Sequence, residues 1–343
     1  MNASKSQPLL LSVLDQSPIP EGATAGDALR NTIDLACLAD RLGYHRYWLA
    51  EHHGSAGLAC ASPEVIIGPV AAATSRIRVG SGGVMLPHYS PLKVAETFSM
   101  LSGLFPGRID LGIGRAPGSG AAVAYALQRD RRQRPPDDFH EQLDELLAYF
   151  ANRAPGSGPF RQVLPHRFMS PEAVLLGSSP QSAIWAAEFG LPYVFADFIN
   201  PEGADIAAYY RENFTPSERL EVPRMGVAVW AICAETRERA IELSASFRMM
   251  MLMLFRGRPI QVPPVERALK FLEQEGHPIE ELPAGRRVIT GEPAQVREAI
   301  EATAAEYGAQ EVFVVNIVYD HAARRRSYEL IAEAFNRTHP AAR

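Results

Sequence analysis

The chain has 343 residues, 47% of them hydrophobic, and a formal net charge of −5 at neutral pH. This length provides one large domain or two small ones, and the apolar fraction is enough for a sizeable core. The near balance of 34 basic and 39 acidic residues gives no electrostatic reason to expect nucleic-acid binding.

The cysteines and the apolar runs indicate where the protein works. Cys37, Cys60 and Cys233 have no metal-type spacing, which is typical of free thiols in a reducing compartment. The apolar stretch before Asp15 is too short for a secretory signal, and the longest apolar run, residues 249–255, is far shorter than a membrane span. We therefore expect a cytoplasmic protein.

Strand-like and helical patterns alternate along the whole chain. Eight strands alternating with eight helices predict a closed parallel α/β barrel, the TIM-barrel architecture. An open, doubly wound sheet is the alternative, but the turn after the first strand lacks the G-x-G-x-x-G of a dinucleotide site. The predicted strands are residues 9–14, 45–49, 77–84, 109–113, 173–177, 193–196, 224–232 and 311–318, and the predicted helices are residues 26–42, 63–74, 91–104, 139–150, 180–189, 201–213, 236–254 and 322–335.

We interpret residues 1–343 as a single barrel domain with an insertion. A barrel of this kind needs roughly 250 residues, so there is surplus chain. Residues 256–287, before the last predicted strand, hold part of it. This segment is rich in Pro and Gly and has its own helical pattern at residues 264–275. Long insertions at the catalytic face of a barrel are usually functional, so we expect this one to form a lid over the active site.

Glycines gather at two predicted strand ends. Ser81-Gly82-Gly83 lies at the end of the third strand, and Gly112 and Gly114 end the fourth. Glycine at a strand end lets a flat ligand approach the backbone closely. The third and fourth strands and the helix between them, residues 91–104, form a βαβ unit. The glycines at its strand ends therefore predict an enzyme with a large planar cofactor.

Two histidines follow the second predicted strand, in Glu51-His52-His53. Adjacent residues on a strand point to opposite sides, so one imidazole can face a ligand while the other packs outward. Such a histidine can accept or donate a proton during catalysis. Structural histidines are the alternative reading, and a metal site is the weakest one because no third ligand follows at a usual spacing.

Four segments together resemble the bacterial luciferase-like monooxygenase family over nearly the whole chain. They are residues 49–53 (LAEHH), 79–91 (VGSGGVMLPHYSP), 106–115 (PGRIDLGIGR) and 176–192 (LGSSPQSAIWAAEFGLP). The resemblance implies a flavin-dependent monooxygenase that takes reduced FMN as a cosubstrate, supplied by a separate flavin reductase. With O2 it would oxidise a small organic substrate such as an aldehyde or ketone.

The resemblance also implies roles for residues at the first three of these strand ends. His52 aligns with the histidine that works beside the flavin. Gly82 and Gly83 align with a non-proline cis peptide under the flavin ring, although a glycine pair also suits a plain β-bulge. Gly114 replaces the cysteine of the light-emitting luciferase subunit, which argues against light emission but not against flavin binding. Arg115 would bind the pyrimidine carbonyls or the phosphate, with a surface ion pair as the alternative.

The fourth segment predicts a phosphate site at a helix N-terminus. Gly177 and Ser178 precede Ser179, a plausible N-cap, and Pro180 suits the first helical position. Backbone N–H groups at such a terminus bind phosphate readily, and Ser182 lies in the same first turn. An ordinary capped helix is the alternative reading.

Two further hypotheses concern cofactor and assembly. A related enzyme that uses the deazaflavin F420 for hydride transfer, and a catalytically silent flavin-binding protein, are the alternatives to a monooxygenase. The predicted helix at residues 63–74 is apolar on more than one face. A barrel helix needs one apolar face toward the strands, so we expect a homodimer.

Overall fold

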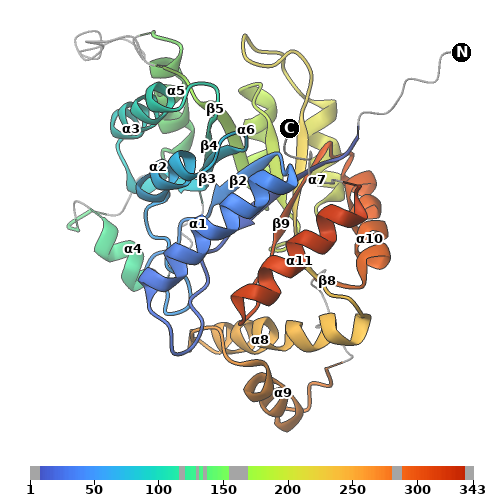
Figure 1. Ribbon diagram of the computed structural model, residues 1–343. Helices are drawn as coiled ribbons and strands as arrows, with labels where there is room; N and C mark the ends of the chain where they lie inside the picture. Colours follow the sequence, from blue (N-terminus) through green and yellow to red (C-terminus); the bar gives the residue numbers. More distant parts are fainter. Residues whose placement is uncertain are drawn as a thin grey trace, which may run out of the picture.

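Eight parallel strands close into a barrel in the computed structural model, which confirms the predicted α/β architecture (Figure 1). The structure describes residues 8–115, 120–128, 131–133, 137–153, 169–279 and 288–336. Neighbouring strands pair in chain order from the first to the seventh, and β9 closes the ring between β7 and β1. The barrel strands are β1 (Leu10–Asp15), β2 (Arg46–Leu49), β3 (Arg78–Met85), β4 (Ile109–Gly114), β5 (Glu172–Gly177), β6 (Tyr193–Ala196), β7 (Met225–Cys233) and β9 (Glu311–Val315).

One extra strand, β8 (Val288–Gly291), was not predicted. It pairs with the second half of β7, from Trp230 to Cys233, whereas β6 pairs with the first half of β7 on residues 225–228. Its sequence, Val-Ile-Thr-Gly, holds a single apolar pair, which gives little strand signal.

Helices surround the barrel, and most of them match the prediction within one to three residues (Figure 1). Two were not predicted, α4 (Ala121–Leu127) and α10 (Pro293–Tyr307), and a single 3₁₀ turn follows β3 at Leu86–His88. The others are α1 (Ala25–Leu42), α2 (Pro63–Ala73), α3 (Pro91–Leu104), α5 (Phe139–Phe150), α6 (Pro180–Glu188), α7 (Ala204–Glu212), α8 (Arg237–Phe255), α9 (Val265–Gln274) and α11 (His321–Ala334).

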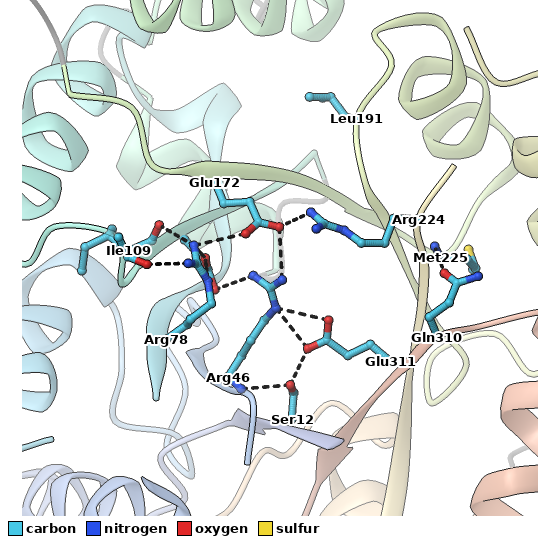
Figure 2. A network of polar contacts seen from close by, with 12 residues as sticks. Ser12, Arg46, Arg78, Ile109, Glu172, Leu191, Arg224, Met225, Gln310 and Glu311 are labelled. Carbon is cyan, nitrogen blue, oxygen red and sulfur yellow. Dashed lines mark hydrogen bonds and ion pairs between the residues drawn. The ribbon is translucent and has the colours of Figure 1, made fainter. Parts of the chain in front are cut away.

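Charged side chains close the N-terminal end of the barrel (Figure 2). Arg46, the first residue of β2, forms ion pairs with Asp110 at 2.9 Å, with Glu172 at 3.1 Å and with Glu311 at 3.1 Å. Arg78, the first residue of β3, also pairs with Asp110. These residues come from five of the eight barrel strands, so the ion pairs link the strand starts to one another.

The basic side chains favour the charged form of Glu172 despite its burial. Burial alone would raise the pKa of Glu172, but Arg46 and Arg224 lower it below its usual value. Between this charged N-terminal end and the opposite, C-terminal end, the barrel interior is apolar. The buried apolar cluster includes Leu14, Trp48, Val174, Val194, Ala228 and Phe313.

The insertion at residues 256–287 is described only as far as residue 279. Its helix α9 packs on α8, where Ala268 and Leu272 join one buried cluster with Ala245 and Met249. Val262 is fixed at the barrel mouth because its N–H donates to Ile19 and its carbonyl accepts from Glu21. The lid role therefore stays a prediction.

None of the described helices has the length and apolar character needed to cross a membrane.

Candidate functional site

A cavity of about 410 Å³ opens at the carboxyl ends of the barrel strands. Its volume falls in the range of about 300–1,000 Å³ that is typical of ligand pockets, and this end of a parallel barrel is where active sites form. All nine predicted site residues line it: His52, Gly82, Gly83, Gly114, Arg115, Gly177, Ser178, Ser179 and Ser182. The structure thus brings together residues from four strand ends, although their roles stay predictions.

The Gly82–Gly83 peptide bond is cis, as expected from the resemblance. The pairing of β3 with β4 also shifts between Ser81 and Val84, so the bulge and the cis bond occur together. A Cβ at Gly83 would lie 2.8 Å from the carbonyl oxygen of Gly112, and one at Gly82 would collide with Leu14. The backbone of β4 leaves no room for a side chain at Gly83, whereas at Gly82 Leu14 would have to move, and with glycine at both positions the backbone is left bare toward the cavity.

Gly114 differs from this pair. A Cβ there would meet nothing closer than the carbonyl oxygen of Val84, at 4.0 Å, and its φ angle lies outside the left-handed region. The fold does not require glycine at this position. The absence of a side chain leaves open space in the cavity there.

His52 lines the cavity, whereas His53 turns away from it toward Glu51. Nδ1 of His52 is buried and has no hydrogen-bond partner within the part of the chain that the structure describes. Burial, and secondly the neighbouring His53, lowers the pKa of His52 to about 4. The imidazole is therefore neutral at pH 7, with one nitrogen available for a ligand.

The start of α6 also faces the cavity. Ser179 is the N-cap, as predicted, but its side chain makes no capping hydrogen bond. The hydroxyl of Ser182, by contrast, donates to the carbonyl of Ser179 at 2.7 Å and lies 2.8 Å from the hydroxyl of Tyr193. Because a serine has a single hydroxyl hydrogen, Tyr193 must be the donor in the second bond. Ser179 can therefore donate to an anion, whereas the Ser182 hydroxyl is already engaged.

Arg115 provides positive charge beside this helix start. Its guanidinium lies over the ring of Trp185, 5.5 Å from the ring centroid, and both residues line the cavity. The structure gives Arg115 no ion pair with a described residue, and its role stays a prediction. A guanidinium held by an aromatic ring next to free N–H and O–H donors is suited to bind an anionic group.

The cavity walls are mostly apolar and aromatic. Trp48 packs on Phe313 with ring centroids 4.3 Å apart, and its indole N–H donates to Asp110 at 2.9 Å. Sequence reasoning did not identify these wall residues, because inward-facing aromatic residues of a barrel look like ordinary core. The other apolar lining side chains include Leu14, Met85, Leu176, Val194, Phe198 and Ile199.

A buried carboxylate, Glu51, was not predicted as part of the site either. It is 2% exposed and is the one acidic side chain among the described lining residues. Its Oε1 accepts from the hydroxyl of Tyr89 at 2.8 Å and lies 2.7 Å from Nε2 of His53, and its Oε2 accepts from the backbone N–H of Met85 at 3.0 Å. Its position beside the histidines was the available signal, but Met85 and Tyr89 lie too far along the chain for their contacts with Glu51 to be inferred.

The site therefore combines the backbone of Gly82–Gly83, the uncapped start of α6 beside Arg115, and a neutral histidine. A sequence model of luciferase-like monooxygenases matches residues 10–311. The chain belongs to the luciferase-like monooxygenase family. The family assignment made from the four sequence segments is thereby confirmed.

Several relatives match this luciferase-like protein over almost their whole length. It is 40% identical over 326 residues to a luciferase-like monooxygenase of Escherichia coli K12, covering 94% of this chain and 96% of that protein. It is 37% identical over 329 residues to the N-acetyl-S-alkylcysteine monooxygenase of Bacillus subtilis 168, covering 94% and 97%. The crystal structure of apo-MsnO8 is similar with a TM-score of 0.87 and 41% identity, covering 96% and 98%.

More distant structures share the fold alone, and they differ in cofactor. The oxygenating constituent of 3,6-diketocamphane monooxygenase from Pseudomonas putida, solved with FMN, has a TM-score of 0.70 at 20% identity and covers 98% of this chain and 99% of that one. An F420-dependent secondary alcohol dehydrogenase has a TM-score of 0.66 at 14% identity, covering 96% and 99%.

Proposed function

We propose that the protein is a flavin-dependent monooxygenase that uses reduced FMN and O2 to oxidise a small, largely apolar organic substrate. The observation that carries this proposal is the cavity itself, in which the cis Gly82–Gly83 backbone, Arg115 and the uncapped start of α6 face one space. A flavin needs these three elements in one place, because it has a flat ring at one end and a phosphate at the other.

The chemistry of the lining residues supports FMN as the cofactor. The bare Gly82–Gly83 backbone and the open space at Gly114 would accept the ring, and the aromatic walls would exclude water. Ser179 and Arg115 would bind the phosphate, while Ser182 holds the first turn of α6 in place. Reduced FMN would supply the two electrons that O2 needs in order to transfer one oxygen atom to the substrate.

His52 would be the catalytic residue. Because burial keeps the imidazole neutral at pH 7, its unpartnered Nδ1 would accept a proton or a hydrogen bond at the reacting end of the cavity. The substrate would be an aldehyde, a ketone or a thioether. The thioether is included because a relative at 37% identity is named for N-acetyl-S-alkylcysteines.

A separate flavin reductase, a homodimer and a cytoplasmic location complete the proposal. The three free cysteines agree with a reducing compartment.

Titration of the purified protein with FMN, riboflavin and F420 tests the cofactor, and 18O2 tests the reaction. We expect FMN to bind best, and we expect one 18O atom in the product formed from an aldehyde, a ketone or a thioether with reduced FMN. Binding of F420 in place of FMN would favour hydride transfer. FMN binding without O2-dependent product would favour a silent flavin-binding protein.

A further inference from the structure

We propose that Glu51 is a positioning residue, whose carboxylate joins the end of β2 to the end of β3 and so sets His52 relative to the Gly82–Gly83 backbone. This inference rests on the proposed function, because it assumes that both features meet a flavin.

The contacts of Glu51 connect two strand ends across 34 residues of chain. The backbone N–H of Met85, the last residue of β3, donates to Oε2 at 3.0 Å. The hydroxyl of Tyr89, just after the 3₁₀ turn that follows β3, donates to Oε1 at 2.8 Å. Met85 is two residues beyond the cis bond, so the carboxylate holds the chain directly after Gly82–Gly83.

His53, which follows β2, is the third partner of the Glu51 carboxylate. Its Nε2 lies 2.7 Å from Oε1 of Glu51, and its ring meets that of His88 edge-on with centroids 6.2 Å apart. The backbone that carries His52 is thus held between two residues whose side chains bind each other. Rotation of Glu51 would release both strand ends at once.

The chemistry of the carboxylate suits this task. A buried carboxylate is costly unless its oxygens accept hydrogen bonds, and the three donors around Glu51 occupy three of its four lone-pair positions. A glutamine could keep the bond from the Met85 N–H with its oxygen. Its NH2 group would then face Tyr89 and His53, which would have to reverse their hydrogen bonds.

The chain offers a matched control at the other end of the same strand. Asp40 is also buried, and its carboxylate accepts the backbone N–H groups of Ser75 and Ile77, each at 2.8 Å, just before β3. Asp40 therefore resembles Glu51 in burial and in partners, but it lies at the N-terminal end of β3, away from the cavity lining.

The test compares Glu51→Ala, Glu51→Gln and Asp40→Asn by three measurements: FMN affinity from flavin fluorescence, the melting temperature, and the hydrogen peroxide released per reduced FMN oxidised. We expect Glu51→Ala to weaken FMN binding about 10-fold and to release more hydrogen peroxide, with Glu51→Gln intermediate because it keeps one of the three bonds. Asp40→Asn should lower the melting temperature but change FMN affinity less than about twofold.

Glu51 variants that melt earlier yet bind FMN and release hydrogen peroxide like the wild type would overturn the positioning role. Equal weakening by Asp40→Asn would overturn it too, because a general loosening of β3 would then explain the effect. If Glu51→Ala does not fold, Glu51→Gln decides alone. A wild-type protein that binds no flavin would overturn the proposed function, and this inference with it.

Discussion

Gly177, at the end of β5, lies directly against Ser182 in the first turn of α6. A Cβ on Gly177 would collide with both Cβ and Oγ of Ser182. The glycine therefore lets the serine reach back to the carbonyl of Ser179 and to Tyr193, which fixes how the helix starts toward the cavity.

The two serines should consequently differ in mutational effect. Ser179→Ala removes a free hydroxyl donor and should weaken FMN binding about 10- to 100-fold, the usual range for a hydrogen bond to a charged group, while riboflavin binding stays unchanged. Ser182→Ala should lower stability more than it weakens FMN binding, because it leaves the buried Tyr193 hydroxyl without this partner. Titration of each variant with both flavins, beside a urea unfolding curve, checks this; equal losses for FMN and riboflavin in Ser179→Ala would count against the phosphate site.

His52→Ala should keep FMN affinity and slow turnover by about 10²–10⁴, the usual contribution of general acid–base catalysis. Stopped-flow absorbance with reduced FMN and O2 measures it, and Asp40→Asn, which lies away from the cavity lining, is the comparison. Rates equal to those of the wild type would remove His52 from the mechanism.

His52 also predicts a pH dependence of stability. Its pKa is lowered to about 4 in the fold, against about 6.5 for a free imidazole, because burial disfavours the charged form. As the pH falls from about 6.5 to about 4, the unfolded chain binds a proton that the folded chain does not, so stability is lost in that window. His52→Asn should show a smaller loss between pH 7 and pH 4.5 in urea unfolding. An identical loss in both proteins would mean that His52 is not held neutral.

The sequence predicted the barrel because its strands are buried on both faces and so appear as apolar runs between clear helix starts. The bounds of β6, α3 and α5 agree with the prediction to the residue. Helix α10 was not predicted even though Pro293 and Gly308 mark its ends, because eight strands and eight helices already completed a barrel. Strand β8 carries no such signal, since its four residues are defined by pairing with β7.

Site residues that belong to short local motifs could be predicted from the sequence. Site residues that depend on contacts between strands could not. Gly82, Gly83 and Ser179 belong to short motifs whose geometry follows from the residues themselves. Glu51 and Trp48 act through Met85 and Asp110, which lie on other strands and are brought near only by strand pairing. Inward-facing residues of one strand reveal nothing about the strand opposite.

The ion-pair cluster of Arg46 at the N-terminal end of the barrel should be essential for stability. Arg46→Met would leave Asp110, Glu172 and Glu311 with one cation fewer in a buried place, and removing one partner of such a network typically costs about 3–5 kcal/mol. The control is Arg239→Met, which breaks an exposed pair with Glu242 and should cost less than about 1 kcal/mol. Urea unfolding at pH 7 compares the two variants. Similar losses of unfolding free energy would show that the Arg46 cluster adds little to stability.

A homodimer should form through the outer faces of α2 and α3. Val65 on α2 is 64% exposed, and Met100 and Leu104 on α3 are 69% and 70% exposed, which places three large apolar side chains on adjacent helices. Light scattering should show twice the chain mass of 37.6 kDa, and Val65→Lys with Met100→Lys should give the monomer. A wild-type monomer at micromolar concentration would contradict this assignment.

The insertion after α8 should open and close beyond Val262 rather than as a whole. Val262 is bound to Ile19 and Glu21 through backbone hydrogen bonds, so the residues up to it are fixed to the barrel mouth. Further on, α9 is held to α8 by an apolar cluster and by an ion pair of 2.5 Å between Arg256 and Glu275, and to the loop after β1 by an ion pair between Arg267 and Glu21. None of these contacts is a backbone hydrogen bond to a barrel strand, so we expect this part of the insertion to have the lower local stability.

Limited trypsin digestion with and without FMN checks this lid. Arg267 on α9 follows Val262, whereas Arg258 precedes it, so the two sites report on the two parts of the insertion. We expect cleavage after Arg267 in the free protein, slower cleavage there with FMN bound, and little change after Arg258 because the chain near it is fixed in both states. Glu275→Gln removes the ion pair with Arg256 and should speed cleavage after Arg267 in the free protein, since the segment then opens more often. Equal digestion in both states would show that the insertion is a fixed part of the barrel wall, because bound flavin would then have no motion to suppress.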